Sequence, residues 1–221
     1  MHCGDPTTLR RVDVLVPFGA ALLTLRLTGK IAGRWRERRA PELLAWSASL
    51  GAYAAASAAL AWGAAAGWSD EAFRVYYLFG GLLTAPLLGL GSLLLKGWRC
   101  AAPVVLVYAG LAAGVALTEP LTAPVTGTAI PDAGDHLDYF PMRILAIAGN
   151  SLGTIAVVAV AALTLRARPL GNSLIVAGVG VAAVGSGLVG VGEAENALSF
   201  AVAAVLLYAG FVAPRRPQTP R

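Results

Sequence analysis

Long apolar segments, each close to the length of a membrane-crossing helix, follow one another along this sequence. A helix needs roughly 20 apolar residues to cross about 30 Å of hydrocarbon. Charged residues make up only 13% of the chain and cluster between the segments, whereas soluble domains carry about 25%. The sequence therefore predicts an all-α membrane protein, a polytopic bundle of seven transmembrane helices that forms one domain over residues 1–221. We expect the helices at about residues 13–32, 42–68, 72–95, 101–118, 141–165, 171–191 and 196–213.

The connections between these helices are mostly short, so consecutive helices should lie antiparallel and close together. The exception is residues 119–140, a loop rich in Pro, Thr, Gly and Asp. No connection is long enough for a soluble domain. A kinase, nucleotide-binding or DNA-binding domain is therefore not expected within these residues.

Basic residues predict the orientation of the bundle, because loops rich in Lys and Arg stay in the cytoplasm. With seven crossings, 13 of the 17 basic residues fall on one side and ten of the 12 acidic residues on the other. We therefore expect the N-terminus outside, the C-terminus in the cytoplasm and the loop 119–140 outside. The abundance of Arg, Ala and Gly favours a bacterial protein of the cytoplasmic (plasma) membrane.

The first segment carries Arg26 and Lys30 where a full crossing would still lie in hydrocarbon. We expect both side chains to reach, or snorkel, to the inner interface. The alternative is a cleaved signal peptide with Arg10 and Arg11 as its charged start. A basic cluster after the segment argues for a retained helix and is expected to contact anionic lipid headgroups, although topological sorting alone also explains it. The cluster comprises Arg34, Arg36, Arg38 and Arg39.

The interiors of the expected spans contain no charged side chain, whereas ion pumps and ion-coupled transporters usually carry one at mid-depth. The last span also lacks the lysine that a retinal protein needs. Catalytic motifs such as HExxH, a phosphate-binding loop or a Ser/His/Asp set are not found. We therefore expect no enzyme activity, no catalytic residues and no cofactor.

Uncharged polar side chains do occur within the spans, and they form the candidate site. They suggest a small intramembrane cavity for an uncharged or amphipathic ligand. The competing interpretation, which we favour, is that they form hydrogen bonds between helices. Pro86 should leave a backbone carbonyl unpaired, which Thr84 or a neighbour must satisfy. The candidate residues are Ser49, Tyr53, Thr84, Tyr108, Asn150 and Thr154.

Two further patterns allow a functional or a structural interpretation. Gly178, Ala182, Ser186 and Gly190 repeat at steps of four and form a face for close helix packing, either inside the bundle or in a homodimer. The outer loop holds Asp132, Asp135, His136 and Asp138, but their spacing does not match a calcium-binding loop. We expect that loop to be solvated and to bind no metal.

Two function classes remain. The first is a non-enzymatic sensor-like or accessory bundle that binds a small or lipid-like ligand, or a membrane or cytoplasmic partner protein, and no nucleic acid. In architecture alone, seven helices with the N-terminus outside resemble the input modules of bacterial signalling proteins. The second class is a transporter or channel for an uncharged solute. This class predicts two related halves with broken helices at corresponding positions, which a single evident break at Pro86 matches poorly.

Overall fold

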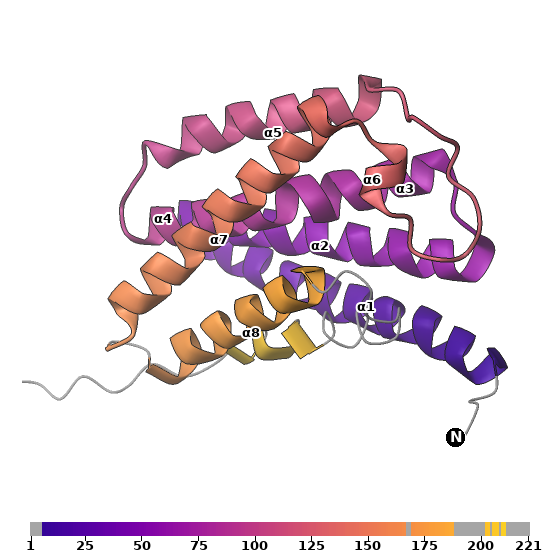
Figure 1. Ribbon diagram of the computed structural model, residues 1–221. Coiled ribbons are helices and arrows are strands. Elements are labelled where there is room, and N and C mark those ends of the chain that lie inside the picture. Colours follow the sequence, from indigo (N-terminus) through magenta and orange to yellow (C-terminus); the bar gives the residue numbers. More distant parts are fainter. Residues whose placement is uncertain (1–5, 167–168, 188–201, 204, 208, 211–221) are drawn as a thin grey trace, which may run out of the picture.

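The computed structural model describes residues 6–166, 169–187, 202–203, 205–207 and 209–210, and within these ranges the regular structure is entirely helical (Figure 1). Five helices are long and apolar enough to cross a membrane. They span Val14–Arg38, Pro41–Ala66, Asp70–Leu95, Ala101–Thr118 and Tyr139–Thr164. A sixth helix, α8 (Pro169–Gly187), has a shorter apolar part, and much of the expected segment 196–213 lies outside the described residues. The architecture is that of a membrane protein.

The first helix is longer than its sequence predicts. We expected it to end near residue 32, but α1 covers Pro6–Arg38. Arg34, Arg36 and Arg38 are good helix formers, and the helix stops only where Pro41 disfavours helical backbone before it. Arg39 forms the turn with a φ of 52°, its N–H donates to the Trp35 carbonyl at 2.7 Å, and α2 (Pro41–Ala66) then begins with proline in its first turn.

The third span is a continuous helix with an irregular middle. It consists of α3 (Asp70–Tyr76), the wider π-helical segment η1 (Tyr77–Leu83) and α4 (Thr84–Leu95). Ser69 caps its start by accepting a hydrogen bond from the Ala72 N–H. The irregular segment ends three residues before Pro86, which has no N–H and crowds the carbonyl four residues earlier. The proline therefore explains why regular α-helical bonding fails here.

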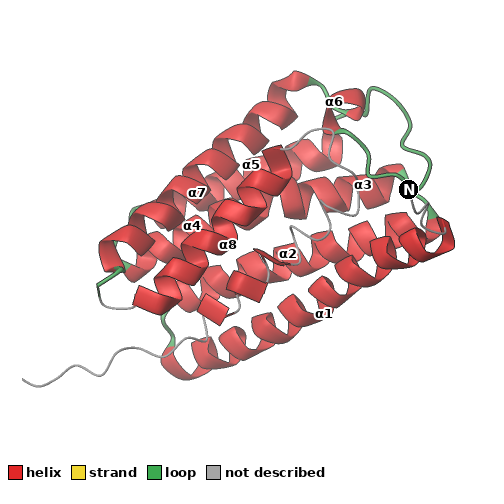
Figure 2. Ribbon diagram, turned by 60° about the horizontal axis from the view of Figure 1, so that its bottom comes forward, coloured by secondary structure: helices red, strands yellow, loops and turns green. Residues whose placement is uncertain are grey.

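The helices form three layers. A central layer holds α2, the third span and α7 (Ile144–Thr164), with α2 packed on α4 and α4 packed on α7. Figure 1 shows α5 (Ala101–Thr118) on one side of this layer and both α1 and α8 on the other. In that outer layer α1 packs on α2 and α8 packs on α7, so the two helices rest on different parts of the central layer (Figure 2).

The closest helix contact in the central layer is made by glycines. A side chain on Gly153 of α7 would collide with the Ala85 carbonyl, and a Cβ on Gly89 of α4 would lie 2.9 Å from the Cα of Gly153. Gly149 lies one turn away, where a Cβ would overlap the Tyr108 hydroxyl. Small residues let helices approach closely in a membrane, where van der Waals packing replaces the hydrophobic effect as the main attraction. The pair Gly149 and Gly153 thus brings α7 against the irregular third span.

The outer loop is a folded cap, whose side chains Asp132, Asp135 and Asp138 are exposed as a solvated loop predicts, while a few of its apolar side chains are buried. Val125 and Leu137 are only 3% and 2% exposed, because they pack in one apolar cluster with Trp68 and Phe73. The backbone N–H of Val125 donates to the Asp70 carboxylate, and the backbone N–H of Trp68 donates to the Gly127 carbonyl at 2.7 Å. The loop contains the short helix α6 (Ala133–His136) and leads through η2 (Tyr139–Arg143) into α7. Apolar residues scattered among its polar ones provide the buried contacts.

The helix α5 lies at the edge of the bundle and is fixed at its C-terminal end by Arg74. The guanidinium of Arg74 donates to the carbonyls of Ala116 and Glu119, each at 2.6 Å. Carbonyls at a helix C-terminus lack partners within the helix and carry partial negative charge. A cation from the third span therefore satisfies two of them and ties α5 to the central layer.

Candidate functional site

A cavity of about 910 Å³ lies between the central layer and the two helices α1 and α8. One wall is the α1 face that carries Val16, Ala20 and Leu27, and the opposite wall includes Val179 of α8 and Leu207. The floor comes from α2, the third span and α7, and the cavity extends at one end to Asp132 in the outer cap. Of the described residues that line it, Asp132 alone carries a charge, and most of the others are apolar.

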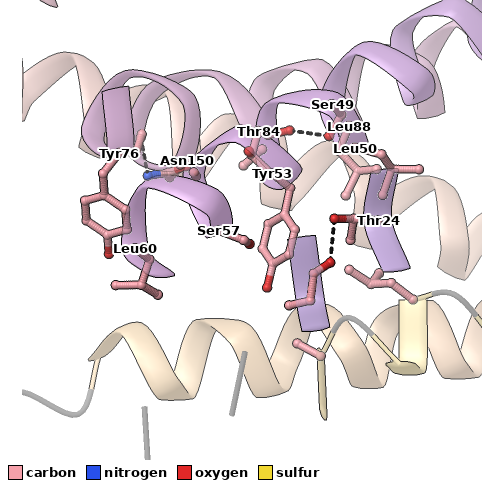
Figure 3. Close-up of a pocket in the computed structure, with 18 of the residues that line it drawn as sticks. Thr24, Ser49, Leu50, Tyr53, Ser57, Leu60, Tyr76, Thr84, Leu88 and Asn150 are labelled. Atoms are coloured by element: carbon pink, nitrogen blue, oxygen red, sulfur yellow. Dashed lines mark hydrogen bonds between the residues drawn. The ribbon is translucent and has the colours of Figure 1, made fainter. Parts of the chain in front are cut away.

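Five of the six candidate residues line this cavity, namely Ser49, Tyr53, Thr84, Asn150 and Thr154. Figure 3 shows Tyr53 pointing into the open space from α2, with Ser57 one turn further along the same helix. The Tyr53 and Ser57 side chains are hydrogen-bonded to each other. The sixth candidate, Tyr108, belongs to α5 and lies on the other side of the central layer. The structure thus brings together residues of α2, the third span and α7 and separates Tyr108 from them.

Several of these polar groups already serve the irregular third span. Ser49 donates to the Thr84 carbonyl at 2.7 Å, and Asn150 donates through Nδ2 to the Gly81 carbonyl at 2.8 Å (Figure 3). The Thr84 hydroxyl donates to the Phe79 carbonyl at 2.7 Å. Backbone carbonyls left free in a membrane must find donors, because lipid offers none. These three side chains are therefore structural groups at the cavity wall.

Tyr108 satisfies the carbonyl that Pro86 leaves unpaired. Its hydroxyl lies 3.0 Å from the Leu82 carbonyl, four residues before the proline, and 3.0 Å from the Leu145 carbonyl on α7. The sequence predicted a donor for this carbonyl and named Thr84 or a neighbour. The donor is the neighbour Tyr108, while Thr84 serves Phe79. Three of the six candidates, Ser49, Tyr108 and Asn150, thus form the interhelical hydrogen bonds of the structural interpretation, while Thr84 bonds within its own helix.

Other parts of the cavity wall have polar atoms that remain available. Among the described residues Thr154 makes no hydrogen bond, and Asn150 uses only Nδ2, so its Oδ1 can accept. Thr24 of α1 also lines the cavity, but its hydroxyl donates to the Ala20 carbonyl at 2.7 Å. The wall therefore offers an acceptor and a hydroxyl on neighbouring turns of α7 within a mainly apolar surface.

The sequence did not identify the α1 side of the cavity. The first expected span is short and contains Arg26 and Lys30, and these charges do not indicate which face of the helix packs against the bundle. Positions 16, 20, 23, 24 and 27 recur at steps of three or four, which is the spacing of one helix face. This spacing could have identified the cavity-lining face of α1 from the sequence. The pair Gly149 and Gly153 was also missed, although glycines four apart in an apolar span typically mark a close helix contact.

Of the other predicted residues, only Asp132 lines the cavity in the part of the chain that the structure describes. Gly178 faces the described residues of the last segment, since a Cβ there would lie 3.1 Å from the Ala203 carbonyl. The side chains of Ala182 and Ser186, and all of Gly190, lie outside the described residues. Within the described part of the chain, no three His, Cys, Asp or Glu side chains are grouped as a metal would require. The four basic side chains at the end of α1, Arg34, Arg36, Arg38 and Arg39, are exposed.

Comparison with known proteins identifies no relative of this chain. No protein-family model matches the chain, and no curated protein and no solved structure is significantly similar to it.

Proposed function

We propose that this chain is a non-enzymatic membrane protein that binds an uncharged, elongated, amphipathic ligand in the cavity between α1 and α8. The observation that carries this proposal is the cavity itself. Its volume of about 910 Å³ falls within the roughly 300–1,000 Å³ typical of small-molecule sites. Tight packing is normal in protein interiors, so a space of this size needs an occupant.

The chemistry of the wall supports an amphipathic ligand. Apolar side chains such as those of Leu23, Leu27 and Leu88 can contact a hydrocarbon chain. Asn150 and Thr154 can form hydrogen bonds with a hydroxyl or carbonyl group on that chain. A charged headgroup would lose its hydration without gaining a counter-ion at this depth, which costs several kcal/mol. We therefore favour a neutral lipid-like molecule over a fatty acid or a phospholipid.

The finer membrane arrangement belongs to the same proposal. We propose seven crossings, the N-terminus outside and the C-terminus in the cytoplasm of a bacterial plasma membrane, supported by the asymmetry of basic residues. The exposed cluster at Arg34, Arg36, Arg38 and Arg39 would then lie at anionic headgroups. Reporter fusions after Arg39, Asp70, Arg99, Asp135, Arg168, Glu193 and Arg216 should alternate between the two sides. Two adjacent fusions on the same side would refute the seven crossings.

Ligand binding is tested with a defined probe. Monoolein, an uncharged single-chain glyceride, is titrated into the purified full-length protein, and bound molecules are counted by native mass spectrometry. We expect one saturable site in the wild type and in Leu152→Trp, whose side chain is 68% exposed on α7. Thr154→Trp should weaken monoolein binding at least tenfold, because the indole would fill space next to the cavity wall. Equal binding by both variants, or equal affinity for oleate, would contradict the proposal.

The alternative is a transporter of an uncharged solute, which the irregular third span favours, because broken helices often form transport sites. Three of the carbonyls in that segment, those of Phe79, Gly81 and Leu82, already accept hydrogen bonds from side chains, so they have less to offer a solute. We expect no substrate-dependent flux in proteoliposomes. Uptake of a neutral metabolite that disappears in Asn150→Ala would favour the transporter.

A further inference from the structure

Along the axis of α1, Arg26 lies much farther from the helix end than a charged side chain at a membrane interface would lie. The helix α1 continues for twelve residues beyond it, to Arg38, a distance of about 18 Å along the axis. Thr28 of α1 is level with Gly51 of α2, because a Cβ on Gly51 would lie 3.7 Å from the Thr28 methyl group. Since the two helices are antiparallel, Arg26 is level with about residue 53, the middle of α2.

If α2 is centred in the bilayer, this level corresponds to the centre of the hydrocarbon. The 26 residues of α2 measure about 39 Å, which leaves roughly 4–5 Å beyond a 30 Å hydrocarbon layer at each end. The nearer edge of the hydrocarbon is therefore about 13 Å from Arg26, beyond the length of an arginine side chain. With α2 centred in the bilayer, Arg26 would not reach the inner interface, unlike the expectation from the sequence. Charged groups at such depth are costly and normally paired.

Arg26 points away from the rest of the bundle. It is exposed, and it lies on the other side of α1 from cavity-lining positions such as Ala20 and Thr24. Figure 2 shows α1 at the edge of the bundle. Arg26 has no hydrogen bond and no ion pair with any residue that the structure describes. Its charge is thus directed outward at mid-depth.

The surface around Arg26 has the form of a helix-packing face. Leu15, Phe18, Leu22 and Leu25 are 52–63% exposed and follow the alternating three- and four-residue spacing of a helix seam. Gly29 continues the same seam, and a Cβ there would meet no atom within 4 Å. A small residue beside large apolar ones allows a second helix to approach closely.

We propose that this outward face of α1 docks a transmembrane helix of a different membrane protein, one that carries an Asp or Glu near the middle of its span. A carboxylate at that depth is the group that pairs with arginine, through two parallel hydrogen bonds. A second copy of this chain is not the occupant, because none of its acidic residues is near the middle of an expected span. They are Asp5, Asp13, Glu37, Glu42, Asp70, Glu71, Glu119, Asp132, Asp135, Asp138, Glu193 and Glu195. Lipid phosphates lie at the interface, out of reach.

The test uses the full-length protein in phosphatidylcholine vesicles and a synthetic polyleucine transmembrane peptide with one central Asp. Association is measured by energy transfer and compared with a peptide that has Leu at the same position. We expect the Asp peptide to bind the wild type at least tenfold more tightly than the Leu peptide. Arg26→Leu should abolish this preference and Arg26→Lys should keep part of it. Lys30→Leu, one turn nearer the end of the helix, should keep most of it.

Three outcomes would overturn the proposal. The first is equal binding of the two peptides to the wild type. The second is a wild-type oligomer that dissociates on Arg26→Leu, since the occupant would then be a second copy. The third is that the Asp peptide binds only after Glu193→Gln and Glu195→Gln, since Arg26 would then be paired within its own chain. If Arg26→Leu does not fold, Arg26→Gln replaces it, with a monodisperse elution profile as the check. None of these results depends on the monoolein site.

Discussion

The contact between α4 and α7 inside the central layer differs from the contact that the outer helices α1 and α8 make with that layer. Where α4 meets α7, the glycines Gly89 and Gly153 bring the backbones together, and the carbonyls of the irregular segment have side-chain donors. Where α1 and α8 cover the same layer, they enclose a cavity of about 910 Å³. The first region has no room for a substitution, whereas the second has room for a ligand. The difference indicates that the central layer holds the fold and the outer layer provides the site.

The largest expected effect comes from the close contact. Gly153→Ala places a methyl group against the Ala85 carbonyl, so the helices must separate, which costs about 2–3 kcal/mol of unfolding free energy. Gly110→Ala on α5, where a Cβ meets nothing within 4 Å, is the matched control and should be nearly neutral. Unfolding in detergent, followed by circular dichroism, measures both. Similar stability of the two variants would remove the basis of the comparison.

A smaller loss is expected when the irregular segment loses a donor. Tyr108→Phe removes the hydroxyl that serves the Leu82 and Leu145 carbonyls, and we expect a loss of about 1–2 kcal/mol of unfolding free energy. Tyr139→Phe, at a side chain that is 59% exposed, should change little. The same unfolding experiment separates them. A neutral Tyr108→Phe would mean that another donor replaces the hydroxyl and that the break is less constrained than it looks.

The smallest effect is expected in the outer layer. Gly178→Ala on α8 brings a methyl group to 3.1 Å from the Ala203 carbonyl and the Leu207 side chain, a tight contact that small shifts relieve. We expect a loss below about 1 kcal/mol of unfolding free energy, and the thermal midpoint should fall by less than in Gly153→Ala. A loss equal to that of Gly153→Ala would show that α8 is as closely packed as α7. The cavity would then be a less adaptable space than we propose.

The sequence predicted much of this architecture because membrane crossing is a requirement on local composition. A helix in hydrocarbon needs length and apolar side chains, and both are visible in a single segment. The five spanning helices fall on five of the expected segments. The cap at Ser69 likewise depends on a local pattern, a serine directly before the helix. The seven crossings and the orientation stay predictions.

Other features had no local signature. The donors to the irregular third span are 26, 35 and 69 residues away from the carbonyls they serve, so no short pattern connects them. The buried contacts of the outer loop had no evident pattern, because Val125 and Leu137 are scattered among polar residues. The cavity wall on α1 was missed for a similar reason, since its counterpart on α8 is far along the chain.

By itself, the sequence determined that this chain is helical and suited to a membrane, because those properties follow from which side chains can leave water. Only the tertiary structure decided which polar groups are already used and which remain for a ligand, because hydrogen bonds between helices depend on how the helices pack. It also placed Arg26 level with the middle of α2. The sequence contains that arginine in a short apolar segment, but its level became clear only once α1 lay against α2 with Thr28 beside Gly51.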